Sequence, residues 1–267
     1  MNVLEQISRW VEAHREEMTA DIARLIAIPS KKGPAEPNHP FGPQPARALD
    51  EALALCEKYG FAIRNYDYYV GTADLGEAPA RLDILAHLDV VDEGAGWHTD
   101  PFTMAEKDSI LYGRGVSDDK GPAVAALYAM RAVKELGLPL SGGVRLILGT
   151  DEESGSHDLP YYFQREKSAP PSFSPDTSFP VYNTEKGRCR PHFSMTLAAE
   201  EALPRVVSLR GGSRVNIVAD EARALVLGLD PDRAAALAAS AVQRCGVRLA
   251  AESAEGGALL KVSGTSA

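Results

Sequence analysis

The sequence has few cysteines, no long apolar run and fewer basic than acidic residues. Its three cysteines form no Cys-x-x-Cys pair, which argues against a disulfide framework and against a thiolate zinc site. No apolar run reaches the roughly 18–20 residues that a membrane-spanning helix needs. The first residues lack the basic and apolar regions of a secretory signal. We therefore expect a cytoplasmic protein that makes no contact with membranes.

The charge balance excludes a further class of function. The chain carries 28 Lys and Arg against 37 Asp and Glu, a formal net charge of −9. Because contacts with phosphates need clustered Lys and Arg, this balance argues against general nucleic-acid binding. Hydrophobic residues make up 45% of the chain, which is enough to bury a core. We expect a globular protein of one large domain or two modest ones.

Helical and strand-like segments alternate along the first two thirds of the sequence. Helices are expected at 3–28, 46–59 and 122–136, and strands at 61–70, 81–88 and 144–148. Strands that alternate with helices are typical of an α/β layered sheet.

The pattern changes near residue 188. Strands are expected at 192–197, 222–229, 247–251 and 259–262, and one helix at 232–244. We predict two domains, 1–187 and 188–267, of which the second is a smaller α+β unit.

A histidine and an aspartate lie at the end of the expected strand 81–88. His87 and Asp89 are two residues apart, so on a strand they share a face. In that arrangement a carboxylate can hold one imidazole nitrogen while the other nitrogen binds a metal. The alternative is a strand-end histidine beside a surface aspartate.

Further acidic residues lie where sites gather in open α/β sheets, at the ends of strands and the starts of helices. Asp118 and Asp119 precede helix 122–136, either as its N-cap or as a pair that needs a cation nearby. Glu152 and Glu153 follow a strand, where one can ligate a metal and the other accept a proton from water. The alternative for the two glutamates is a solvated loop. Asp176 lies between two prolines and is either a turn residue or a ligand.

Six motifs occur in an order that resembles a known family. They are His87-Leu-Asp-Val-Val, Gly96-Trp-His-Thr-Asp-Pro-Phe102, Leu111-Tyr-Gly-Arg-Gly-Val-Ser-Asp-Asp-Lys-Gly-Pro122, Leu148-Gly-Thr-Asp-Glu-Glu-Ser-Gly155, Phe173-Ser-Pro-Asp-Thr-Ser-Phe-Pro180 and Glu185-Lys-Gly187. The sequence resembles the dinuclear zinc metallopeptidases that include aminoacylase, glutamate carboxypeptidase and succinyl-diaminopimelate desuccinylase. Within this superfamily it is similar to the bacterial dipeptidase V-like (Sapep-like) branch.

The resemblance implies a fold and a set of site residues. The fold is an α/β zinc-exopeptidase-like catalytic domain, with a mixed sheet flanked by helices, followed by the first part of a ferredoxin-like lid domain. A complete site would hold two Zn²⁺ ions, with Mn²⁺ or Co²⁺ as alternatives. The implied roles are metal ligation by His87, Asp118, Glu153 and Asp176, general-base catalysis by Glu152, orientation of His87 by Asp89, and substrate contact by Asn216. The Asp118–Asp119 peptide bond is expected to be cis.

The implied activity is metal-dependent hydrolysis of dipeptides, with a small peptide as substrate. One alternative is an N-acyl-amino-acid deacylase or desuccinylase with the same metal chemistry. Another is an inactive metal-binding fragment, because the sequence looks C-terminally truncated relative to the family and lacks two expected histidines. We accordingly expect one metal to bind far better than the second. We also expect weak activity unless a further segment or a partner chain completes the site.

Overall fold

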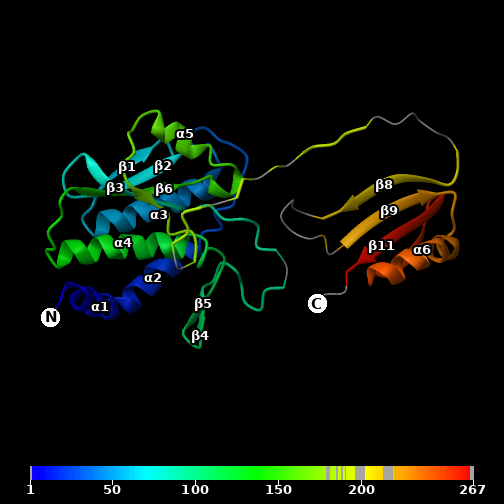
Figure 1. Ribbon diagram of the computed structural model, residues 1–267, viewed down its shortest axis with the longest axis horizontal. Coiled ribbons are helices and arrows are strands. Elements are labelled where there is room, and N and C mark those ends of the chain that lie inside the picture. Colours follow the sequence, from blue (N-terminus) through cyan, green and yellow to red (C-terminus); the bar gives the residue numbers. More distant parts are fainter. Residues whose placement is uncertain are drawn as a thin grey trace. The chain divides into compact units, whose positions relative to one another are not determined.

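The computed structural model describes residues 2–94, 96–178, 181–184, 186–187, 189, 191–195, 202–212, 219 and 221–264. The chain falls into two compact units, Met1–Lys186 and Gly187–Ala267 (Figure 1). In the part of the chain that is described, no helix has the length and apolar character needed to span a membrane.

A five-stranded mixed sheet forms the centre of the first unit. Its strand order is β1 (Ala62–Tyr66), β2 (Val70–Leu75), β6 (Gly143–Gly149), β3 (Ala80–His87) and β7 (Ser172–Phe173). Strand β2 pairs with β6 in antiparallel orientation, whereas β3 runs parallel to both β6 and β7. The predicted α/β class with a mixed sheet is confirmed.

Helices cover both faces of this sheet (Figure 1). Helices α3 (Pro43–Lys58) and α4 (Lys120–Glu135) pack against one face, and α1 (Val3–Ala13) and α2 (Arg15–Ile26) pack against α4. The short helix α5 (Asp158–Phe163) lies on the opposite face, near β2. The apolar core between the sheet and the larger helical layer includes Leu49, Leu53, Leu88, Val124, Leu127, Leu146 and Leu148.

Parallel pairing brings the ends of β3 and β6 together. The two strands are in register, with His87 opposite Gly149 at their last paired position. The start of α4 lies at the same edge, because the buried Asp119 carboxylate accepts a 3.0 Å hydrogen bond from the main-chain N–H of His87. Three segments that are distant in sequence therefore begin or end at one edge of the sheet.

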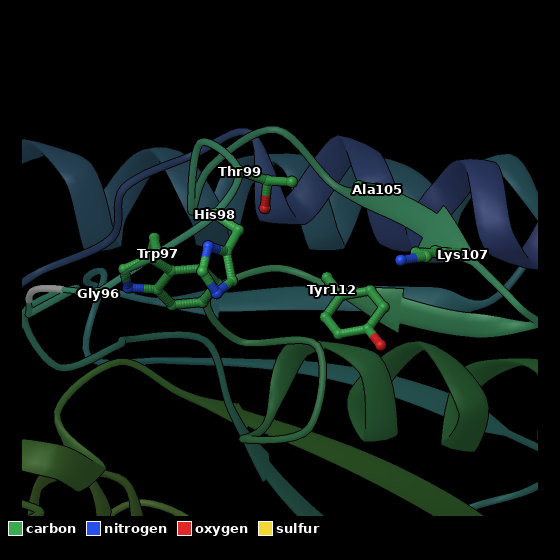
Figure 2. A pocket seen from close by; sticks show the side chains of 7 residues that line it. All are labelled: Gly96, Trp97, His98, Thr99, Ala105, Lys107 and Tyr112. Carbon is green, nitrogen blue, oxygen red and sulfur yellow. The ribbon is translucent and has the colours of Figure 1, made fainter.

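The hairpin of β4 (Ala105–Lys107) and β5 (Ile110–Tyr112) forms a separate two-stranded sheet. With loop 96–99 it lines an open pocket of about 430 Å³. His98 lies in this pocket across from Tyr112 (Figure 2). None of the residues that line it belongs to the predicted metal or catalytic set.

The second unit is a four-stranded antiparallel sheet with one helix. The strand order is β10 (Arg248–Ala254), β11 (Gly257–Ser263), β9 (Glu221–Leu227) and β8 (Arg205–Gly211). Helix α6 (Pro231–Cys245) packs against β10 and β11. The helix begins where the Asp230 side chain accepts a hydrogen bond from the N–H of Arg233, and it ends at Gly246 in the left-handed region.

Two predicted elements of the first unit are interrupted. The segment predicted as one strand, 61–70, is a hairpin, because Asp67 and Tyr68 have positive φ angles of 52° and 61°. The helix predicted at 3–28 is broken at His14, where φ is −108° and ψ is 10°. The His14 ring stacks on Trp10 and lies 3.8 Å from Glu135 of α4, so tertiary contacts outweigh the helical pattern there.

The strand prediction for the second unit is wrong at one end. Residues 192–195 form no strand, and 196–197 lie outside the described residues. Strand β8, by contrast, was not predicted. Its pairing with β9 shifts register between Val206 and Ser208, and such a bulge breaks the two-residue alternation by which strands are recognised.

A buried carboxylate connects α2 to the rest of the helical layer. Asp21 is 2% exposed and accepts hydrogen bonds from the hydroxyls of Tyr59 and, at 2.8 Å, Tyr128. Burial is the largest cause that raises the pKa of both tyrosines, so both hydroxyls remain protonated donors. This network joins α2, α4 and the end of α3.

We expect Tyr128→Phe to lower the free energy of unfolding by about 1.5–3 kcal/mol, the usual cost of losing a buried hydrogen bond to a charged group. Urea unfolding followed by circular dichroism measures this change. Tyr112→Phe is the control, because the Tyr112 side chain is exposed, and its effect should stay within about 0.5 kcal/mol. Equal effects of the two substitutions would contradict the role assigned to the Asp21 network.

Candidate metal centre

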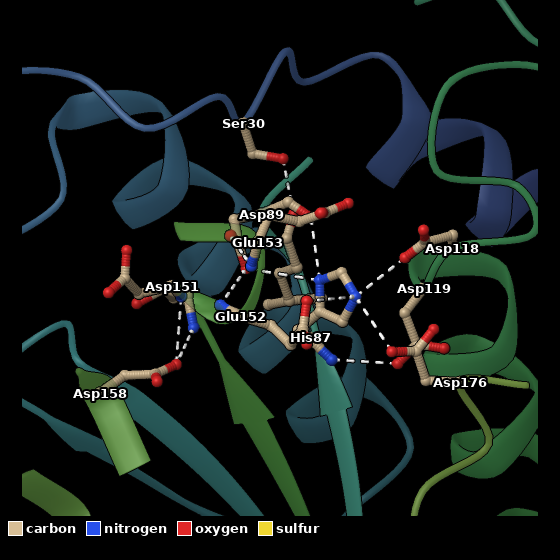
Figure 3. Close-up of polar contacts among 12 residues, drawn as sticks. Ser30, His87, Asp89, Asp118, Asp119, Asp151, Glu152, Glu153, Asp158 and Asp176 are labelled. Atoms are coloured by element: carbon tan, nitrogen blue, oxygen red, sulfur yellow. Dashed lines mark hydrogen bonds and ion pairs between the residues drawn. The ribbon is translucent and has the colours of Figure 1, made fainter. Parts of the chain in front are cut away.

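The imidazole of His87 lies at the end of β3 and faces carboxylates (Figure 3). Its Nδ1 donates a 3.0 Å hydrogen bond to the main-chain oxygen of Asp89, which leaves Nε2 to face the carboxylates. Nε2 is 3.0 Å from Asp118 Oδ1, 3.6 Å from Asp176 Oδ2 and 4.0 Å from Glu152 Oε2. The side chain of His87 is only 4% exposed, so these groups surround a buried ring.

Three different segments supply the four surrounding carboxylates. Asp118 precedes α4, and Asp176 follows β7. Glu152 and Glu153 begin the 3₁₀ turn Glu152–Ser154, which follows β6. Since β3, β6 and β7 are parallel, all of these side chains come from the carboxyl-end edge of the sheet or from the helix that starts there.

The oxygen and nitrogen atoms form two groups with the dimensions of a metal site. In one group, potential ligand atoms of His87, Glu152 and Asp176 lie within 4.8 Å of one another. In the other, the same limit holds for His87, Asp118 and Glu153. The structure thus brings together the four predicted metal ligands and the predicted general base. Distances alone do not separate the roles of Glu152 and Glu153.

The electrostatics of the group favour a bound cation. Burial alone would lower the pKa of His87, but the carboxylates of Asp118, Asp176 and Asp89 outweigh burial and raise it. Burial, followed by repulsion from Asp118, raises the pKa of Glu153 to about 7. Several carboxylates therefore share one positive imidazolium, and a divalent cation between them would relieve their mutual repulsion. The donor set fits a divalent metal ion.

Asp89 differs from the sequence prediction in the atoms it uses. Its main-chain oxygen, rather than its carboxylate, makes the closest contact with the His87 ring. The carboxylate instead accepts hydrogen bonds from the main-chain N–H groups of Glu152, at 3.0 Å, and Glu153, at 3.1 Å. Asp89 is 1% exposed, so it connects the histidine to both glutamates from a buried position.

Two neighbours of Asp118 are buried in ways the sequence did not indicate. The peptide bond between Asp118 and Asp119 is cis, as the resemblance implied. Burial raises the pKa of Asp119 to about 7, and its Oδ1 has no hydrogen-bond partner among the described residues. Lys120 does not pair with these carboxylates. Its Nζ donates to the main-chain oxygens of Leu25 and Ile28, which anchors the start of α4 to the end of α2.

Asn216, the predicted substrate-contact residue, lies outside the described residues.

Comparison with known proteins identifies relatives of the sequence. Residues 84–258 match the family described as "Peptidase family M20/M25/M40", a range that contains all the described site residues. "Putative dipeptidase YtjP" of Bacillus subtilis (strain 168) is 38% identical over 218 residues, which cover 80% of this chain and 47% of that protein. The "Beta-Ala-Xaa dipeptidase" of Lactobacillus delbrueckii subsp. lactis is 33% identical over 222 residues, which cover 82% of this chain and 47% of that protein. The chain thus spans about half the length of the curated relatives it matches.

Solved structures share the fold. Human carnosine dipeptidase 1 superposes with a TM-score of 0.56 and 27% identity, covering 64% of this chain and 41% of that chain. The dipeptidase Dug1p from Saccharomyces cerevisiae gives a TM-score of 0.52 at 20% identity, over 61% of this chain and 38% of that chain, and supports the fold alone. The family match covers more than half of the sequence and agrees with the resemblance of the six motifs to metallopeptidases. The chain belongs to peptidase family M20/M25/M40.

Proposed function

We propose that this chain carries the metal centre of a dipeptidase that uses divalent cations to hydrolyse the peptide bond of small peptides. The observation that carries the proposal is the set of ligand atoms from His87, Asp118, Glu152, Glu153 and Asp176 within 4.8 Å of one another in two groups. Names of relatives point the same way, since two of them are called dipeptidases.

The resemblance implies how two cations would be held. His87, Asp118 and Asp176 would be ligands of one cation, and Asp118 and Glu153 would be ligands of the second. Nitrogen and oxygen donors without a thiolate suit Zn²⁺, and also Mn²⁺ or Co²⁺. We also propose a cytoplasmic location, because an odd and sparse set of cysteines fits a reducing compartment better than a disulfide framework.

Glu152 is assigned to proton transfer. Bound divalent cations would polarise the peptide carbonyl and lower the pKa of a neighbouring water. The Glu152 side chain is 50% exposed, so its carboxylate can reach that water, and it lies 4.0 Å from His87 Nε2. Burial and nearby carboxylates raise its pKa, which helps it to hold a proton and then deliver it to the leaving nitrogen.

The second unit is assigned to substrate binding. We infer that residues 188–267 are the first part of a lid domain, and that 1–187 belong to the catalytic domain. Asn216 would contact the substrate from this lid. The α+β character of the second unit supports the assignment, since it is the architecture that the resemblance implied.

We expect Glu152→Ala to reduce turnover by at least about 10²-fold while metal binding is retained, because the substitution removes the base but no ligand. Turnover is measured with a panel of dipeptides and N-acyl-amino acids on the longest reading frame that contains this chain, and metal binding on the chain itself. Glu106→Ala, on the separate β4–β5 hairpin, is the control and should change neither quantity.

Two results would count against this assignment. Loss of metal from Glu152→Ala, with retention by Glu153→Ala, would reverse the roles of the two glutamates. Turnover of N-acyl-amino acids but not of dipeptides would mean that the protein is a deacylase and not a dipeptidase.

We expect the chain to bind one equivalent of Zn²⁺ far more tightly than a second. His87 offers one ligand atom, because Nδ1 is engaged by Asp89, so one cation would have three described protein ligands and the other only Asp118 and Glu153. Calorimetry with elemental analysis measures the stoichiometry, and His87→Ala should abolish the tight site. Two equally tight sites would refute the expectation.

A further inference from the structure

The turn that carries the two glutamates is held by buried carboxylates through its main chain. Four consecutive N–H groups, those of residues 150–153, all donate to carboxylate oxygens. Asp158 Oδ2 accepts from residue 150 at 2.7 Å and from residue 151 at 3.1 Å. Asp89 accepts from residues 152 and 153. Both aspartates are 1% exposed, and Figure 3 shows them on either side of the turn.

Asp158 joins two secondary-structure elements at this point. It is the first residue of α5, and its second oxygen, Oδ1, accepts a 2.8 Å hydrogen bond from the N–H of Leu159. The same carboxylate therefore fixes the start of α5 and the end of β6. The approach is close: a Cβ atom on Gly149 would lie 2.5 Å from Asp158 Oδ2. A glycine at the end of β6 is what allows this contact.

Three main-chain N–H groups donate to the Asp158 side chain, so this side chain must carry only hydrogen-bond acceptors. A carboxylate has no N–H of its own, and hydrogen bonds to its charge are about twice as strong as neutral ones. An asparagine at position 158 would turn its NH₂ group toward one of the main-chain N–H groups, whichever way the amide is flipped. At least one donor would then face another donor in a buried place.

The carboxylate of Asp151 is turned away from the metal group. It is fully buried and accepts from Lys32 Nζ at 2.7 Å and from both the N–H and the ring Nδ1 of His157, at 3.1 Å and 2.8 Å. Asp151 therefore anchors the turn to loop 30–42. Because its carboxylate is engaged by Lys32 and His157, it does not serve as a metal ligand. Only the two glutamates that follow it are left to reach His87.

We propose that Asp158 is a positioning residue that sets where Glu152 and Glu153 project toward His87. Asp158 contacts neither of the glutamate side chains nor the histidine, and it acts through the main chain of residues 150 and 151. The inference rests on the proposed function for its catalytic consequence. Its consequence for metal binding is independent of the substrate.

The test compares Asp158→Asn with a matched control, Asp83→Asn. Asp83 is also 1% exposed and lies on β3 of the same sheet. One of its oxygens accepts from the N–H of Ala169 at 2.7 Å, and the other has no partner among the described residues, so an amide can replace it without opposing a known donor. Co²⁺ is the probe, because its visible absorption reports the ligands around it, and binding is titrated at a temperature where each variant is folded.

We expect Asp158→Asn to weaken Co²⁺ binding by about 10–100-fold and to change the absorption spectrum, as is usual when a group that supports a ligand is removed. Asp83→Asn should leave both unchanged. In the longest reading frame that contains the chain, kcat should fall for Asp158→Asn with little change in KM. A merely structural role of Asp158 would lower the unfolding midpoint of Asp158→Asn and leave the affinity and spectrum of the folded variant unaltered.

Gly149→Ala provides a second variant if Asp158→Asn does not fold. It retains every polar group but places a methyl group against Asp158 Oδ2, so the same loss of Co²⁺ affinity is expected. Unchanged affinity and spectrum in the folded variants would overturn the positioning role. If Co²⁺ affinity falls as expected but no peptide is hydrolysed by the unsubstituted protein, the proposed function fails and the positioning role stands.

Discussion

The site is organised by one buried imidazole that faces four carboxylates. Oxygen atoms of Asp89, Asp118, Glu152 and Asp176 lie within 4.0 Å of a His87 ring nitrogen. Such a concentration of negative charge repels itself, so it persists only where the surrounding structure fixes each group or a cation lies between them. Much of the first unit serves that requirement. The parallel pairing of β3 with β6 sets the position of the histidine relative to the glutamates, and Asp119 attaches the start of α4 to the same edge.

The elements that carry the ligands were predictable because they are buried and regular. Strands β3 and β6 are rich in Leu and Ile, and α4 is rich in Ala. Predictions failed where the chain departs from a regular period. The hairpin after β1 turns at Asp67 and Tyr68, which lack the Asn-Gly or Asp-Gly signature of a tight turn, and β8 contains a bulge. In both places the strand boundaries depend on a local backbone conformation that the pattern of apolar and polar side chains does not encode.

The candidate ligands were likewise predictable, whereas their supports were not. His87, Asp118, Glu153 and Asp176 stand in motifs whose residue types suggest metal chemistry. Asp158 was not singled out, since an acidic residue at the start of a short helix is common and needs no further explanation. Its role depends on main-chain N–H groups, which every residue except proline possesses and which therefore leave no trace in the sequence. Lys120 shows the same limit, because its partners are carbonyl oxygens at the end of α2.

The turn at 150–153 combines a main chain that is fixed by hydrogen bonds with a Glu152 side chain that is exposed to solvent. Its main-chain N–H groups are held by Asp89 and Asp158, both almost fully buried, while the Glu152 side chain is half exposed. This combination suits a carboxylate that must exchange protons with water and yet stay at a fixed distance from a metal. Hydrogen bonds to the side chain itself would stabilise its charged form, lower its pKa and make it a weaker base. The hydrogen bond from the Glu153 N–H to Asp89 also holds the main chain in place beside Asp118, whose charge contributes to raising the pKa of Glu153. Holding the backbone with buried carboxylates meets both conditions. It restrains the main chain of each glutamate and leaves the oxygens of the glutamate side chains available for proton transfer and metal binding.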